Sequence, residues 1–95
     1  MPIRKPWSRL TAENIAQLPE SDGVYELGNE EEATILIAGA PNLREALREH
    51  LDGDDECLGQ ARLFRYEEIF MYTMRESELL QKFIRENNRL PECNI

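Results

Sequence analysis

The stretches Gly23-Val24-Tyr25 and ILIAGAPNLREALREHL, residues 35–51, decide the fold of this chain. The first begins an apolar segment that predicts a strand over residues 24–27. A loop of Gly28-Asn29 and three glutamates follows, and residues 34–38 then form a nearly continuous β-branched and apolar run. Such a run is typical of a central strand buried on both faces. Because the loop is short, the two strands are expected to pair antiparallel.

The second stretch ends in a pattern typical of an amphipathic helix. Asn42 is a favoured N-cap and Glu45 stands at the third helical position, so the pair predicts a capping box. The residues that follow repeat at helical spacing: Leu43, Ala46, Leu47, His50 and Leu51. Asp52-Gly53 predicts the end of this helix, with Gly53 in the left-handed conformation.

The segments before this stretch predict an arm and a short helix. Residues 1–10 are expected to be irregular because Pro2 and Pro6 disfavour regular structure. Trp7 and Leu10 are expected to anchor this arm to the body of the protein. Thr11 predicts the N-cap of a short helix that ends before Pro19.

The segments after the stretch predict a further strand and a closing helix. Residues 61–66 alternate as a strand, and residues 69–73 are apolar and β-prone. We interpret the pair as one bent strand or two short ones, with a helical turn as the alternative. Residues 73–76, Thr-Met-Arg-Glu, predict a second capping box that uses Glu76. Behind it lies an apolar stripe of Leu79, Leu80, Phe83 and Ile84.

The predicted order is helix, strand, strand, helix, strand, helix. It indicates a small α+β fold, with an antiparallel sheet of about three strands flanked by helices. The length predicts a single domain over residues 1–95.

Composition limits the classes of function. The net charge is −8, with acidic clusters at residues 30–32 and 52–56. The acidic composition of the protein therefore argues against nucleic-acid binding, which depends on Lys and Arg side chains that contact phosphates. No apolar run approaches the roughly 20 residues of a membrane helix, and the N-terminus lacks a secretory apolar region. We expect a cytoplasmic location with Cys57 and Cys93 as free thiols, a disulfide between them being the alternative.

At this point the pattern resembles the GIY-YIG nuclease domain, best known from the excision nuclease of bacterial nucleotide excision repair. The similar region runs from Leu18 to Asn94. It includes Leu18-Pro19 before Gly23-Val24-Tyr25, the helix around Asn42-Leu43-Arg44, and the closing Pro91 to Asn94. The resemblance implies phosphodiester hydrolysis, in which a tyrosine acts at the nucleophile, a helix arginine stabilises the phosphate and a glutamate holds a divalent metal.

Several of these catalytic positions carry other residues here. Tyr25 keeps the tyrosine of the first motif, and Asn94 keeps the terminal asparagine. The tyrosine of the second motif falls on Leu36, its final glycine on Ala38 and the helix arginine on Ala46. The metal-binding glutamate falls on Gln81 or Lys82. Because losing one such group commonly costs about 10²–10³ in rate, the resemblance implies a catalytically inactive domain without a cofactor.

The alternative is a divergent endonuclease or DNA-binding protein with a rearranged site. Its candidate catalytic residues are Tyr25, Arg44, Glu76, Glu78 and Asn94, and it would require Mg²⁺ or Mn²⁺. Arg44 lies two positions before Ala46, about 200° around the helix, so it is expected to point elsewhere. Lone His50 is expected to be a partly buried, hydrogen-bonded residue.

The favoured hypothesis is a protein-binding or scaffolding module of unknown function. Its partner is expected to be another protein or a second copy of the chain. Met71, Tyr72 and Met74 are candidates for an adaptable apolar docking surface, although they equally suit a core. Trp7, Phe64, Tyr66, Phe70 and Tyr72 are expected to be core residues rather than a platform for stacking bases.

Overall fold

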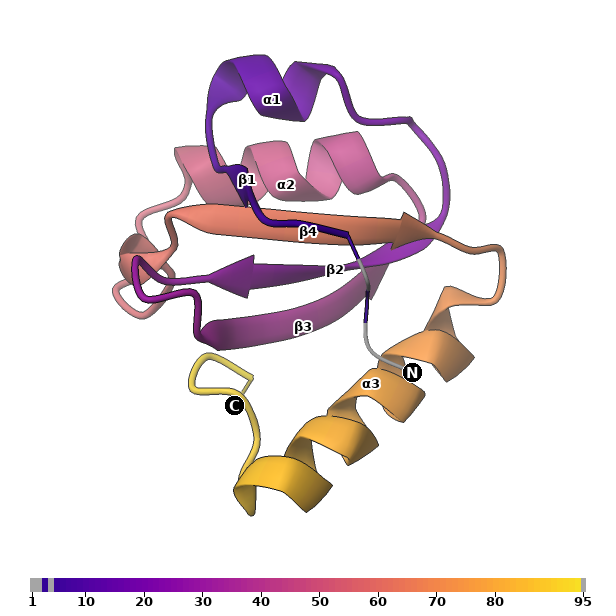
Figure 1. The fold of residues 1–95 in the computed structure, drawn as a ribbon. Coiled ribbons are helices and arrows are strands. Elements are labelled where there is room, and N and C mark those ends of the chain that lie inside the picture. The colour runs from indigo at the N-terminus through magenta and orange to yellow at the C-terminus, as the bar shows by residue number, and fades with distance from the viewer. Residues whose placement is uncertain (1–2, 4, 95) are drawn as a thin grey trace.

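The computed structural model describes residue 3 and residues 5–94, which form three layers (Figure 1). Helices α1 and α2 cover one face of a sheet, and α3 covers the other (Figure 1). The elements in chain order are β1 (Ser8–Arg9), α1 (Ala12–Ala16), β2 (Gly23–Gly28), β3 (Thr34–Ala40), α2 (Leu43–Asp52), the 3₁₀ helix η1 (Leu58–Gln60), β4 (Leu63–Glu68) and α3 (Tyr72–Asn87). The expected α+β class and antiparallel sheet are confirmed.

The strands of the described residues lie in the order β1-β4-β2-β3, with antiparallel pairing throughout. The sheet therefore has four strands where about three were expected. The additional strand, Ser8–Arg9, lies in the N-terminal arm, which was expected to be irregular. It pairs with Leu63 and Phe64 of β4. Trp7 holds the arm in place, as expected, because its ring packs so closely on Gly28 that a Cβ there would lie 2.9 Å from it.

Strand β3 is buried on both faces, as expected, but its predicted central position is wrong. It lies at the edge of the sheet, next to β2 alone. Ile35, Leu36 and Ile37 are buried because helices cover both faces of the sheet. The outer edge is covered by the C-terminal segment, whose Cys93 N donates to Ile35 O at 2.8 Å.

The core has one part on each face of the sheet. On one face, Leu43 and Leu47 of α2 are fully buried against Leu27 and Phe64. On the other, Leu79 of α3 packs with the apolar residues Ile3, Val24 and Ile37. Within the described ranges, no helix has both the length and the apolar character needed to cross a membrane.

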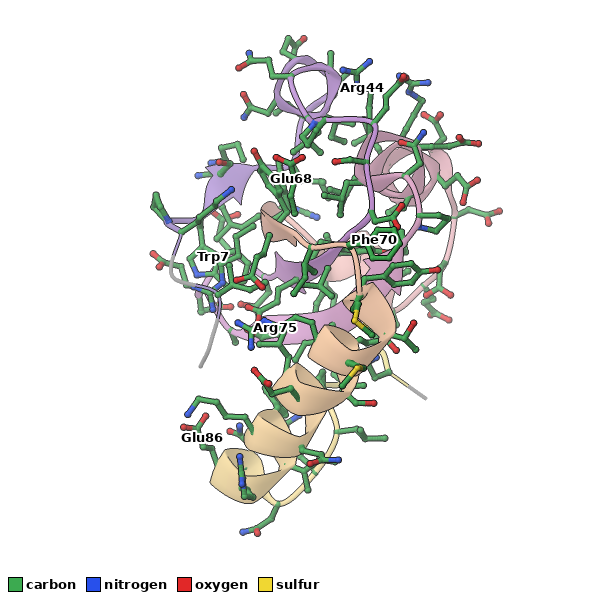
Figure 2. The ribbon with its side chains drawn as sticks, turned by 90° about the vertical axis from the view of Figure 1, so that its right-hand side faces the viewer. Trp7, Arg44, Glu68, Phe70, Arg75 and Glu86 are labelled. Atoms are coloured by element: carbon green, nitrogen blue, oxygen red, sulfur yellow. A yellow bond between two sulfur atoms is a disulfide. The ribbon has the colours of Figure 1, made fainter. Side chains whose placement is uncertain are left out.

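A buried arginine attaches α3 to the sheet (Figure 2). Arg75 is 7% exposed, and its Nε donates to Glu67 Oε1 of β4 at 2.6 Å. Arg75 also pairs with Glu78 one turn further along the helix. The hydrogen bond from Arg75 to Glu67 raises the pKa of the guanidinium. Breaking a buried pair leaves an uncompensated charge, so this contact fixes where the first half of α3 sits.

Helix α3 begins earlier than expected, and the predicted strand over residues 69–73 is wrong. The helix starts at Tyr72, and its N-cap, Met71, makes no side-chain hydrogen bond, so the predicted capping box at residues 73–76 does not form. Tyr72 and Leu79 lie two turns apart on the face of α3 that packs on the sheet. The face of α3 that packs on the sheet therefore extends back to the partly buried Tyr72, and this packing overrides the β propensity of the residue.

The capping residues of the two other helices confirm two predictions and correct one. The Thr11 side chain accepts from Asn14 N, and the Asn42 side chain accepts from Glu45 N, as expected of N-caps. Gly53, however, has φ −78°, an extended rather than left-handed conformation. The helix therefore ends at Asp52, as predicted, without a left-handed residue.

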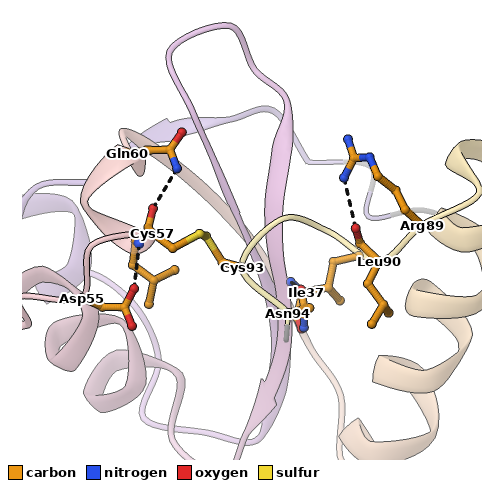
Figure 3. Close-up of a disulfide and its surroundings, with 9 residues drawn as sticks. Ile37, Asp55, Cys57, Gln60, Arg89, Leu90, Cys93 and Asn94 are labelled. Atoms are coloured by element: carbon orange, nitrogen blue, oxygen red, sulfur yellow. Dashed lines mark hydrogen bonds between the residues drawn. A yellow bond between two sulfur atoms is a disulfide. The ribbon is translucent and has the colours of Figure 1, made fainter.

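The two cysteines form a disulfide, so the expectation of free thiols is wrong (Figure 3). Cys57 precedes η1, and Cys93 lies in the C-terminal segment beside β3. The fold brings their Cα atoms to 5.8 Å despite a sequence separation of 36. That distance is within the range of protein disulfides. The bridge ties the acidic loop to the segment that covers the sheet edge.

Candidate functional site

An open hollow of about 490 Å³ lies where β2 and β3 meet α2. Tyr25 comes from β2 and Ala46 from α2, so the hollow holds two positions to which the resemblance assigns catalytic groups. It is lined by Tyr25, Gly39, Ala40, Pro41, Asn42, Glu45, Ala46, Glu49 and His50.

The centre of the hollow is a hydrogen-bonded pair. The Tyr25 hydroxyl oxygen lies 2.6 Å from His50 Nε2, and the two rings meet edge to face. Burial lowers the pKa of His50, although Glu49 and Asp55 oppose this shift. Burial also raises the pKa of Tyr25 to about 12, with further contributions from Glu49 and Glu76. The hydroxyl therefore keeps its proton beside a neutral imidazole, as expected of a partly buried histidine, and the tautomer of His50 sets which of the two groups donates.

The electrostatic character of the hollow is negative. Its lining includes the carboxylates of Glu45 and Glu49, and Glu76 is close enough to raise the pKa of Tyr25. Among the residues that the structure describes, its lining contains no lysine or arginine, and Ala46 occupies the position of the helix arginine. A phosphodiester brings a negative charge that grows more concentrated during hydrolysis, so this arrangement opposes both binding and reaction.

Glu76 has a different role from the one expected. It does not cap α3; its Oε2 accepts from Gly39 N at 2.6 Å and so connects α3 to β3. A Cβ on Gly39 would lie 2.5 Å from Tyr72 Cδ1 and 3.4 Å from Glu76 Oε2. Gly39 is therefore the position that lets the first turn of α3 approach the strand.

The other candidates of the rearranged site do not converge on Tyr25. Arg44 points away, as expected, because its Nε donates to Leu18 O at 2.8 Å and its Nη1 pairs with Glu20. Glu78 is paired with Arg75. Of the three positions expected to have lost catalytic groups, Leu36 is buried in the core, Ala46 lines the hollow and Gln81 is exposed on α3.

Asn94 acts on the backbone of β3. Its Oδ1 accepts from Ile37 N and its Nδ2 donates to Ile37 O, both at 2.8 Å (Figure 3). The side-chain amide thus pairs with the strand edge as another strand would. This gives Asn94 a structural reason to be present that is independent of nuclease chemistry.

Replacing Asn94 by alanine is expected to lower the free energy of unfolding by about 1–3 kcal/mol, because two partly buried backbone groups lose their partners. Asn94→Asp keeps the acceptor and loses the donor, so it should also destabilise. Urea denaturation measures both. The control is Asn87→Ala, which removes one exposed hydrogen bond to Phe83 O. Equal effects at the two positions would contradict the assigned role.

The position to which the resemblance assigns the metal ligand carries no carboxylate. The resemblance places the metal-binding glutamate on Gln81 or Lys82, and Lys82 is paired with Glu86. Across residue 3 and residues 5–94, no group of three His, Cys, Asp or Glu side chains is arranged to hold a metal ion. Glu76 brings one carboxylate toward Tyr25, but Gly39 N occupies its Oε2.

Sequence reasoning missed the partnership of Tyr25 with His50 and Glu49. The signal lay in helical spacing: Glu49 and His50 follow Ala46 by three and four residues, so they share the face to which the resemblance assigns the arginine. The contact of Glu76 with Gly39 had a weaker signal. An isolated glycine in a strand indicates that something approaches the backbone closely.

The lone histidine allows a direct test of this geometry. NMR titration of His50 is expected to give a pKa below its ordinary 6.5, because burial disfavours the charged ring. The unfolded chain then takes up a proton at a higher pH than the folded protein. Stability should therefore fall as pH drops below about 6.5, and it should fall less in His50→Gln. A pKa at or above 6.5 would contradict the buried, neutral ring.

Structural comparison shows which class of fold holds this hollow. The GIY-YIG N-terminal endonuclease domain of UvrC from Thermotoga maritima, bound to its catalytic magnesium, matches with a TM-score of 0.64 and 24% identity. The match covers 87% of this chain and 93% of that domain. An asparagine-to-alanine mutant of the same domain matches with a TM-score of 0.64 and 23% identity, over 87% and 92% of the two chains. The protein has a GIY-YIG-like fold.

Comparison of sequences gives the family. The chain belongs to DUF7508, a domain of unknown function, whose family model matches residues 1–86. A search of curated proteins found no match.

Proposed function

We propose that this GIY-YIG-fold domain does not hydrolyse phosphodiesters and instead binds another protein. One observation supports the proposed absence of phosphodiester hydrolysis. Where the resemblance requires an arginine, Ala46 lines a hollow whose charged neighbours are Glu45, Glu49 and Glu76. Substrate phosphate would meet repulsion where a nuclease provides attraction.

The ion pairs of four arginines also argue against phosphate binding at these four positions. Arg9, Arg44, Arg65 and Arg75 each pair with a glutamate. A phosphate would have to displace these carboxylates, and the net charge of −8 opposes its approach. The rearranged-nuclease alternative is weaker still, because Arg44 is held by Leu18 O and Glu20.

Protein binding is supported by what the surface exposes. Phe70, Met71 and Met74 are 85%, 58% and 66% exposed, although Phe70 was expected to be a core residue. Scattered exposed apolar residues are ordinary, but a contiguous group often marks an interaction site. Methionine adapts its shape to different partners.

A cleavage assay tests the loss of activity. The purified protein is incubated with plasmid and single-stranded DNA plus Mg²⁺ or Mn²⁺, beside the UvrC domain as a positive control. We expect no cleavage by this protein and no DNA binding even at low ionic strength. Cleavage that is reproducible and disappears in Tyr25→Phe would overturn the proposal.

We also propose that the protein works in the cytoplasm. The disulfide is the observation against this location, because cytosolic thiols are kept reduced. Trapping of free thiols at the moment of cell lysis, followed by mass spectrometry, distinguishes a cytoplasmic location from an oxidising compartment. Fully bridged Cys57 and Cys93 would favour an oxidising compartment instead.

A further inference from the structure

The turn from β4 to α3 presents an apolar surface formed by Phe70, Met71 and Met74, called here the Phe70 surface. Phe70 is 85% exposed. Figure 2 shows Phe70 and Glu68 where the sheet leads into α3. The surface has a firm base, because Gly23 pairs with Glu68 and Ile69 N donates to Asp22 O at 3.1 Å.

A hollow adjoins this surface. It has a volume of about 420 Å³ and is lined by Ser21, Asp22, Glu68, Ile69 and Phe70. Its ionisable residues, Asp22 and Glu68, are both acidic, and Ser21 Oγ orients Glu68 by donating to its Oε2 at 2.8 Å. An exposed aromatic ring and two methionines thus stand beside a pocket whose charges are negative.

We propose that the Phe70 surface binds a basic amphipathic segment of another protein. The apolar face of the segment would cover Phe70, Met71 and Met74, and its lysines or arginines would meet Asp22 and Glu68. The argument is charge complementarity: an apolar surface bordered by carboxylates favours a partner that is apolar and cationic. This inference rests on the protein-binding function proposed above and specifies its surface and partner class.

The same charges disfavour other occupants. A twofold dimer built on this surface would enclose the Asp22 and Glu68 carboxylates of both copies in one interface, and each copy already carries a net charge of −8. A phosphate backbone or an anionic membrane would meet the same repulsion. A cationic partner is attracted by the same carboxylates that repel these anionic occupants.

Methionine-methyl NMR provides the test, because the chain has three methionines and two of them belong to the Phe70 surface. The probe is a leucine–lysine peptide of about 14 residues, roughly four helical turns, patterned as an amphipathic helix. Controls are a scrambled peptide of equal composition and a leucine–glutamate peptide of the same pattern. We expect the lysine peptide alone to shift the Met71 and Met74 methyl signals and to bind less tightly as salt is raised.

Substitutions then assign the binding to this surface. Phe70→Ala should weaken binding at least about tenfold, as at aromatic hot spots, whereas Leu90→Ala, at another exposed apolar residue, should not change it. The double variant Asp22→Asn with Glu68→Gln should reduce both the affinity and its salt dependence. Glu31→Gln, an exposed acid in the β2–β3 loop, is the matched control.

Each contrary outcome overturns the inference. The contrary outcomes are that the lysine peptide does not bind, that the glutamate peptide binds equally well, and that Phe70→Ala leaves binding unchanged. Dimerisation that sedimentation detects and Phe70→Ala abolishes would assign the surface to a second copy. Binding of the lysine peptide that leaves the Met71 and Met74 signals unshifted would leave protein binding standing while removing this surface, and DNA cleavage would remove the proposed function independently.

Discussion

Reducing the disulfide between Cys57 and Cys93 is expected to lower the free energy of unfolding by about 3–4 kcal/mol. The bridge closes a loop with a sequence separation of 36. In the chain-entropy account, a loop of that length restricts the unfolded ensemble by this amount. The loss should be large for so small a protein, since typical total stabilities are about 5–15 kcal/mol.

Urea denaturation with and without a thiol reductant measures the effect. The double variant Cys57→Ser with Cys93→Ser should match the reduced protein and should not respond to reductant. The single variant Cys93→Ser removes the bridge but keeps the Cys57 side chain. Comparing it with the double variant therefore separates the effect of the bridge from the effect of Cys57 packing. Identical midpoints for the oxidised and reduced protein would contradict the stabilising role.

Gly23→Ala is the second substitution with a large expected effect. A Cβ at this position would lie 2.5 Å from Glu67 O and 2.6 Å from Leu43 Cδ1. Glu67 belongs to β4, which pairs with Gly23 in the sheet, and Leu43 is fully buried in the core. Neither can move without disturbing the sheet or the packing of α2. We expect a loss of about 3 kcal/mol or more, at the upper end of the cost of overpacking.

Gly59→Ala is the matched control, because a Cβ on Gly59 meets nothing within 4 Å. It should leave the urea midpoint nearly unchanged or raise it slightly through the unfolded state. Equal midpoints for the two variants would show that β2 tolerates a side chain at Gly23. The glycine of the first motif would then need another explanation.

The sequence predicted the elements near the two motifs and was weaker toward the C-terminus. The strands predicted to begin at Val24 and Thr34, and the N-caps Thr11 and Asn42, depend on local patterns and were confirmed. The start of α3 was misplaced because Tyr72 has a β-favouring side chain, whereas its burial against β3 is a tertiary contact.

The edge position of β3 could not be read from its residues, because an apolar run reports burial and not strand order. The disulfide was missed for a related reason. Two cysteines far apart in sequence give no geometric information until the fold places them together. The Tyr25–His50 pair joins a strand to a helix, and its signal, the shared helix face with Ala46, depends on knowing how α2 lies on the sheet.

The last residues of the chain have a consequence for association in crowded solution. Ile35 and Ile37 of β3 direct backbone groups toward Cys93 and Asn94, which satisfy them within the same molecule. A shortened chain lacking Asn94 would present these groups as a template on which a foreign strand can add. The C-terminal segment is thus an intramolecular competitor against strand-to-strand aggregation, and the covalent link to Cys57 keeps that competitor at high local concentration.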